Sequence, residues 1–200
     1  MSTFLFSNFT GVTVLLDDLR YGSAGSHCRT SSNTLCSTGN KVSTETVYQY
    51  IEYLEAANIL IRTDVYNIRG KRVLSSKHRY HVSDLGIKHA LLGYRPEDTP
   101  GHMENIICTE LLGRGFDVYV GDFNRKEIDP IAEKNGNRMY IQACQTVSSD
   151  ETWKREFGNL ESIGDSFPKY VITLEPENHE GTTSSGIVCC GLKDFPLMDF

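Results

Sequence analysis

Two neighbouring segments of this chain carry side chains that could bind a metal ion. Asp129 lies in a segment that alternates polar and apolar residues, and Gln142 and Cys144 lie in a second such segment. Side chains of an extended strand alternate between its faces, so Gln142 shares a face with Cys144 and Asp129 shares one with Glu127. Carboxylate and amide oxygens are hard ligands, so Asp129 and Gln142 could hold Mg²⁺ weakly, with several waters. The turn at residues 135–137 predicts a β-hairpin with strands at 126–133 and 138–147.

The same positions lack half of the groups that metal-dependent nucleases use. Those enzymes place an aspartate on one strand and Glu-x-Lys on the next, and the lysine orients water and stabilises charge on the phosphate. Here Gln142 replaces the glutamate and Cys144, a soft ligand, replaces the lysine. Lys126 and Lys134 could supply the missing amine. Pro130 also removes an amide from a strand that such a fold buries centrally. We expect nuclease activity to be lost, and an ordinary hairpin with a solvated acidic face is the alternative.

The elements around the hairpin predict an α/β (α+β) domain of restriction-endonuclease-like type. A helix from about His102 to Arg114 places Glu104 on the same stripe as Ile107, Cys108 and Leu111, at the edge of a site beside the sheet. A strand at 116–120, the hairpin, a helix at 151–163 and a strand at 170–174 follow. The order is therefore αβββαβ, which is that of the restriction-endonuclease-like core.

The preceding segment predicts part of a winged helix. Ser43 can cap a helix whose apolar residues recur at helical spacing from Val47 to Ala57, and strands at 59–66 and 73–82 follow. Winged helices place a helix in the major groove and the hairpin on phosphates. An acid-free basic run could neutralise those phosphates, and its members are Arg69, Lys71, Arg72, Lys77 and Arg79. The alternative is a solvated hairpin that keeps an edge strand from aggregating.

Charge is divided unevenly along the chain. Residues 41–92 carry eight Lys/Arg against five Asp/Glu, whereas residues 93–200 carry ten against nineteen. The whole chain is acidic, with a pI of about 5.5. This balance supports DNA binding only in part, because winged helices also serve as protein-contact domains.

Composition sets the expected boundaries. Residues 1–40, rich in Ser, Thr, Gly, Asn and Cys, are expected to be irregular, disordered or the product of a frame error. A winged-helix-like domain at 41–92, a linker at 93–103 and a nuclease-like domain at 104–200 follow. The six cysteines contain no C-x-x-C pair, so reduced thiols are expected. No stretch approaches eighteen apolar residues, so we expect a soluble cytoplasmic protein without a membrane partner.

Several short motifs resemble one known family, the AAA-type ATP-binding proteins of bacteria and archaea that carry a C-terminal domain of unknown function with a degenerate nuclease-like fold. In chain order the motifs are residues 42–47 leading into 50–55, residues 80–86, Glu104-Asn105 with Glu110-Leu111, residues 127–129, residues 140–142, and residues 155–157 with Leu160. The resemblance covers roughly residues 41–200. A Gln at position 142 is usual in that family, whereas Pro130 and Cys144 depart from its pattern.

The resemblance implies that an ATPase domain precedes these parts. No G-x-x-x-x-G-K-[ST] motif occurs in the 200 residues, so ATP is expected to bind only to a missing ATPase domain. We therefore expect a non-catalytic C-terminal region or fragment of an ATPase, which binds DNA, the ATPase domain or another protein. The alternatives are a surviving PD-(D/E)XK nuclease that uses Glu104, Asp129 and Gln142, and a gene product with no retained activity.

Overall fold

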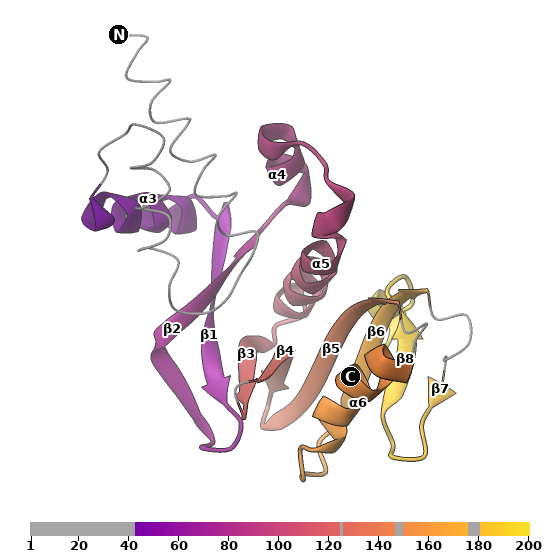
Figure 1. Cartoon of the computed structure of the whole chain (residues 1–200). Coiled ribbons are helices and arrows are strands. Elements are labelled where there is room, and N and C mark those ends of the chain that lie inside the picture. The colour runs from indigo at the N-terminus through magenta and orange to yellow at the C-terminus, as the bar shows by residue number, and fades with distance from the viewer. Residues whose placement is uncertain (1–42, 125, 147–149, 176–180) are drawn as a thin grey trace, which may run out of the picture. The chain divides into compact units, whose positions relative to one another are not determined.

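The computed structural model describes residues 43–124, 126–146, 150–175 and 181–200. The chain is a mixed α/β protein with a large sheet and several helices, as the sequence predicts (Figure 1). It divides into two compact units. Unit 1 comprises Met1–Thr63 and Ser76–Gly101, and unit 2 comprises Asp64–Ser75 and His102–Phe200. The irregular segment predicted at residues 1–40 lies outside the described residues.

Unit 1 is built on helix α3 (Thr44–Ala56), as its helical spacing predicts. The Ser43 side chain accepts a hydrogen bond from the amide of Thr46, so the predicted N-cap is present. Strands β1 (Leu60–Asn67) and β2 (Arg72–Val82) follow, then helix α4 (Leu85–Leu92), which was not predicted. Buried side chains of α3 form the core with Leu60 and Val82.

The segment predicted as an exposed linker contains regular structure. A 3₁₀ helix, η2 (Pro96–Asp98), leads directly into helix α5 (Thr99–Gly113). Asp98 is buried, and its carboxylate lies 3.8 Å from the ammonium of Lys88, which is also buried. A buried charge needs such a partner, so this segment belongs to the packed part of unit 1.

Unit 2 contains the predicted hairpin within a mixed sheet. Its strands are β3 (Asp117–Phe123), β4 (Lys126–Lys134), β5 (Asn137–Thr146), β6 (Lys169–Glu175), β7 (Gly181–Thr182) and β8 (Val188–Gly191). The hydrogen-bonded order is β2-β1-β3-β4-β5-β6-β8-β7, in which β1 and β2 take part in this unit through residues 64–67 and 72–75. Because β1 pairs with β3 in parallel from Asp64 onward, the hairpin end belongs to unit 2.

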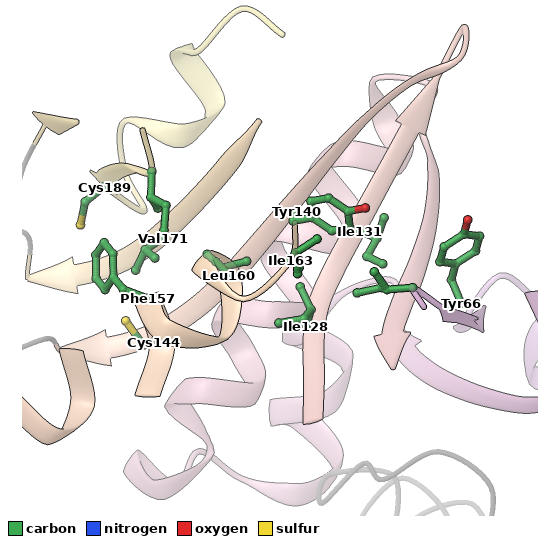
Figure 2. Close-up of a cluster of buried hydrophobic side chains, with 12 residues drawn as sticks. Tyr66, Ile128, Ile131, Tyr140, Cys144, Phe157, Leu160, Ile163, Val171 and Cys189 are labelled. Atoms are coloured by element: carbon green, nitrogen blue, oxygen red, sulfur yellow. The ribbon is translucent and has the colours of Figure 1, made fainter. Parts of the chain in front are cut away.

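Helices α5 and α6 (Asp150–Glu161) cover opposite faces of this sheet. Ile141 packs with α5, whereas its neighbour Tyr140 packs in the cluster that contains α6. Successive strand residues point to opposite faces, so the two helices sandwich the sheet. Figure 2 shows the α6 side, where Phe157 and Leu160 meet side chains of the central strands. A last 3₁₀ helix, η3 (Phe195–Leu197), places Phe195 in the α5 cluster.

The β3–β4 pairing is interrupted by a β-bulge. Asp129 and Pro130 together face Val120, because the register passes from Tyr119↔Ile131 to Gly121↔Ile128. A bulge leaves one residue outside the hydrogen-bond ladder, so it accommodates the missing amide of Pro130 in a central strand. This is how the sheet tolerates the proline that the sequence analysis placed in conflict with a central strand.

Candidate functional site

The metal-binding candidate Asp129 lies at this bulge. Its side chain is buried, whereas that of Glu127, two residues earlier, is exposed. The register shift between Ile128 and Ile131 places Asp129 in the bulge itself. The Asp129–Pro130 peptide bond is cis. Asp129 is therefore a buried carboxylate at an irregular point of the sheet.

Gln142 and Cys144 lie on the α6 face of β5, because they alternate with Ile141, which faces α5. Cys144 is a core residue. It is buried in the apolar cluster with Phe157 and Val171, and Figure 2 shows its sulfur beside the Phe157 ring. Gln142 differs, because its Oε1 is buried and has no hydrogen-bond partner among the described residues. Of these two nuclease-motif positions, Cys144 is part of the apolar core and Gln142 offers a buried hydrogen-bond acceptor.

The remaining motif carboxylate, Glu104, lies on α5 at the other side of the sheet. The structure therefore separates Glu104 from Cys144 by the sheet itself. Within the described residues, no three His, Cys, Asp or Glu side chains gather in a way that could hold a metal ion.

The two lysines that could supply the missing amine both have other contacts. The Lys126 ammonium donates a hydrogen bond to Asn159 Oδ1 of α6 at 2.8 Å. The Lys134 ammonium donates to the carbonyl of Arg114 at 2.7 Å, at the turn end of the hairpin. Lys126 is the nearer in sequence to Asp129, and its contact fixes it against a helix.

The residues of the predicted basic run differ in burial, and they belong to different units. Arg69, Lys71 and Arg72 are exposed at the β1–β2 turn of unit 2, where Arg69 Nη1 donates to Asn124 Oδ1 at 3.2 Å. Lys77 is exposed in unit 1. Arg79 is buried, so its side chain does not belong to an exposed phosphate-binding set. Nucleic acid can therefore reach the three turn residues in unit 2 and Lys77 in unit 1.

The exposed face of α3 carries no positive charge. The helix sequence TETVYQYIEYLEA contains three glutamates and neither lysine nor arginine. Tyr48 and Tyr53 are 53% and 67% exposed, and Glu52 between them is also exposed. A surface of this composition repels phosphates, whereas exposed aromatic side chains are typical of protein contacts.

A second polar cluster was not predicted. Arg138 Nη2 donates to Glu133 Oε2 at 2.6 Å, and its Nη1 donates to Tyr66 Oη at 2.8 Å. Burial alone would lower the pKa of Arg138, but hydrogen bonds to Glu133, Tyr66 and Tyr140 outweigh it and raise the pKa. Burial also raises the pKa of Tyr140, whose hydroxyl donates to Asp165 at 2.6 Å.

One contact of this cluster, the ion pair between Glu133 and Arg138, could have been predicted from the sequence. A two-residue Asn-Gly turn fixes the hairpin register, and the next pair out from the turn is Glu133 opposite Arg138. Opposite charges on directly paired strand residues predict an ion pair. The contact with Tyr66 joins residues 72 positions apart and had no such signal.

None of the helices in the described residues is long and apolar enough to cross a membrane. A family model described as a domain of unknown function (DUF8612) matches residues 19–98. A Haemophilus influenzae protein named "Uncharacterized protein" is 34% identical over 166 residues, which cover 83% of this chain and 40% of that relative. The chain thus spans less than half the length of the relative. No solved structure matches the chain.

Proposed function

We propose that this chain is a non-catalytic, protein-binding region of a larger protein. The exposed face of α3 carries the proposal, because it presents Tyr48, Glu52 and Tyr53 without a single cation. The H. influenzae relative, of which the match covers 40%, supports a larger parent. The motif resemblance to AAA-type ATP-binding proteins supports an ATPase as the remainder, and ATP would then bind there.

The unit 2 arrangement supports a restriction-endonuclease-like core used as scaffold. The order α5, β3, β4, β5, α6, β6 is αβββαβ, with antiparallel β3-β4-β5 and with β6 parallel to β5. Cys144 lies in the apolar core where a nuclease needs an exposed ammonium. The order of α3 followed by strands β1 and β2 supports a winged helix that binds protein.

Binding to the remainder of the H. influenzae relative tests this proposal. The double variant Glu52→Arg/Tyr53→Ala should bind at least about tenfold more weakly, because truncated aromatic anchors and reversed charge both lower affinity. The matched control is Tyr94→Ala/Glu97→Arg, which changes the same residue types at exposed positions outside α3. Equal loss in both variants, or no binding by the unmodified chain, contradicts the proposal.

DNA binding is the second candidate, and the exposed cations of the β1–β2 turn favour it. If the turn contacts phosphates, Lys71→Ala/Arg72→Ala should reduce the slope of log affinity against log salt by about 0.9 per lost contact. The control is Arg95→Ala/Lys193→Ala, which removes the same charges from other exposed positions. Fluorescence anisotropy with a short duplex at several salt concentrations measures the slope, and an unchanged slope removes this candidate.

A further inference from the structure

The turn end of the β4–β5 hairpin borders a cavity of about 440 Å³ in unit 2. It is lined by the turn itself, by residues just before β3 and β6, by Tyr170 and by Phe200. This volume lies in the range of roughly 300–1,000 Å³ that small-molecule sites occupy. Asp129 and Gln142 lie near the middle of β4 and β5 and do not line the cavity, so it is separate from the nuclease-motif positions.

Four aromatic side chains line the cavity. Phe116, Phe167, Tyr170 and Phe200 all contribute to it. The Tyr170 and Phe200 rings meet edge to face with centroids 5.4 Å apart, and Phe167 and Phe200 remain 37% and 41% exposed. Large rings left exposed beside a cavity offer a surface on which a planar ligand can stack.

Two cationic side chains line the cavity as well, next to aromatic rings. Lys134 has no carboxylate partner among the described residues, since its ammonium donates to the Arg114 carbonyl and lies 5.2 Å from the Phe116 ring centroid. Arg138 also lines the cavity, but Glu133 neutralises it. A Lys ammonium has three donors, so Lys134 keeps capacity for an anion.

The turn between β4 and β5 fixes the position of Lys134. Asn135 and Gly136 both have positive φ, at 54° and 79°, and Lys134 pairs directly with Asn137 across them. Such a two-residue turn is rigid and matches the twist of its strands. Asn135 and Asn137 line the cavity together with Lys134. A ligand therefore meets a preformed set of donors, which limits the entropy lost on binding.

We infer that this cavity binds a small planar aromatic anion, with its ring against the exposed aromatic side chains of the lining and its charged group on Lys134. The shared chemistry is one flat ring system and one carboxylate or phosphate group. A nucleoside monophosphate and a free aromatic carboxylate both satisfy it. The inference does not depend on the α3 surface or on the proposed protein-binding function.

Titration of the whole chain with small ligands tests the inference. Isothermal titration calorimetry and NMR measure the binding. AMP and 2-naphthoate supply a ring with a phosphate or a carboxylate, adenosine supplies a neutral ring, and inorganic phosphate supplies the anion alone. We expect at least one of the two charged aromatic probes to bind at least about tenfold more tightly than adenosine and than phosphate. Whichever of the two binds more tightly identifies the anion.

Two variants locate the binding. Lys134→Gln should lower the affinity for the probe that binds by at least about tenfold, because a hydrogen bond from a charged donor is lost. Phe167→Ala should weaken it through lost stacking, and Lys193→Gln at an exposed lysine outside the lining should not. Circular dichroism confirms that each variant is folded. Absence of binding by both charged aromatic probes, equal binding of adenosine, or full binding by folded Lys134→Gln overturns the inference.

Discussion

The side chains at the motif positions of the β4–β5 hairpin determine whether this region can bind a metal ion and cleave a phosphodiester. Asp129 is a buried carboxylate on β4, whereas the motif positions on the neighbouring strand β5 hold a neutral amide, Gln142, and a thiol in the apolar core, Cys144. A single carboxylate with an amide binds Mg²⁺ weakly, and in the part of the chain that the structure describes Lys126 and Lys134 donate hydrogen bonds to Asn159 and to the Arg114 carbonyl. The side chains at these positions therefore predict weak metal binding and no nuclease activity.

The first prediction follows from this chemistry. Purified protein should show no Mg²⁺- or Mn²⁺-dependent nicking of plasmid DNA above background over an extended time course. The Asp129→Ala variant, run beside it, gives the background for contaminating nucleases. Metal-dependent nicking by the unmodified chain that disappears in Asp129→Ala would restore the nuclease reading, with Lys126 as the first lysine to test.

The second prediction concerns a buried histidine in unit 1. Burial first, and then the charge of Arg79, lower the pKa of His81 from 6.5 to about 3. Its Nε2 lies 3.2 Å from Thr63 Oγ1, which itself donates to the Arg79 carbonyl. The Thr63 hydroxyl thus accepts from His81, whose neutral ring must carry its proton on Nε2. A positive charge at this position has no room for solvation.

The sign follows from proton linkage. Below pH 6.5 the unfolded chain protonates His81 and the folded chain does not, so the free energy of unfolding should fall as the pH drops from 6.5 to about 3. The slope contributed by this residue approaches about 1.4 kcal/mol per pH unit. Urea titrations at several pH values should show a shallower fall for His81→Gln. Parallel curves for the two proteins would mean that His81 is not the group responsible.

At the scale of elements, the β-bulge depends on a glycine in the neighbouring strand. A Cβ atom at Gly121 would lie 2.8 Å from the carbonyl oxygen of Ile128 and 2.7 Å from Cδ1 of Ile131. Backbone at that distance cannot move aside without shifting β4. Gly121→Ala should therefore lower the free energy of unfolding by about 1–3 kcal/mol.

Gly158 in α6 provides the matched control. Nothing lies within 4 Å of a Cβ added there, and the position is inside a helix. Gly158→Ala should raise the free energy of unfolding by roughly 0.5–1 kcal/mol, because alanine loses less backbone entropy. Chemical denaturation of both variants measures the two signs, and a neutral Gly121→Ala would show that the bulge can relax.

Local signals explain which elements the sequence could predict. The hairpin follows from alternation on both sides of Asn135-Gly136, and α3 follows from its cap and apolar spacing. Strand β8 has four residues, too few for alternation to show, and its parallel pairing with β6 joins distant segments. Arg79 illustrates the limit for the site, because a run of like charges does not reveal which face of a strand is covered.

At the scale of the whole molecule, the chain is divided differently from the linear order that composition predicts. Unit 2 takes residues 64–75 out of the predicted winged-helix segment, because β1 pairs with β3 there. Pairing between strands more than fifty residues apart is a long-range contact, and a local sequence pattern does not predict it. Each unit nevertheless has its own apolar clusters, one around α3 and two on the faces of the unit 2 sheet.

Separate cores lead to the last prediction. Ile51 is 2% exposed in the α3 cluster, so Ile51→Ala should cost about 2–5 kcal/mol within unit 1. Native-state hydrogen exchange should then speed up for amides of α3 while those of α5 and β5 keep their protection. Leu160→Ala, in the α6 cluster, is the reciprocal variant and should act on unit 2. Equal loss of protection in both units after either substitution would show that the two cores unfold as one cooperative body, and the clustered contacts would then not mark independent folding units.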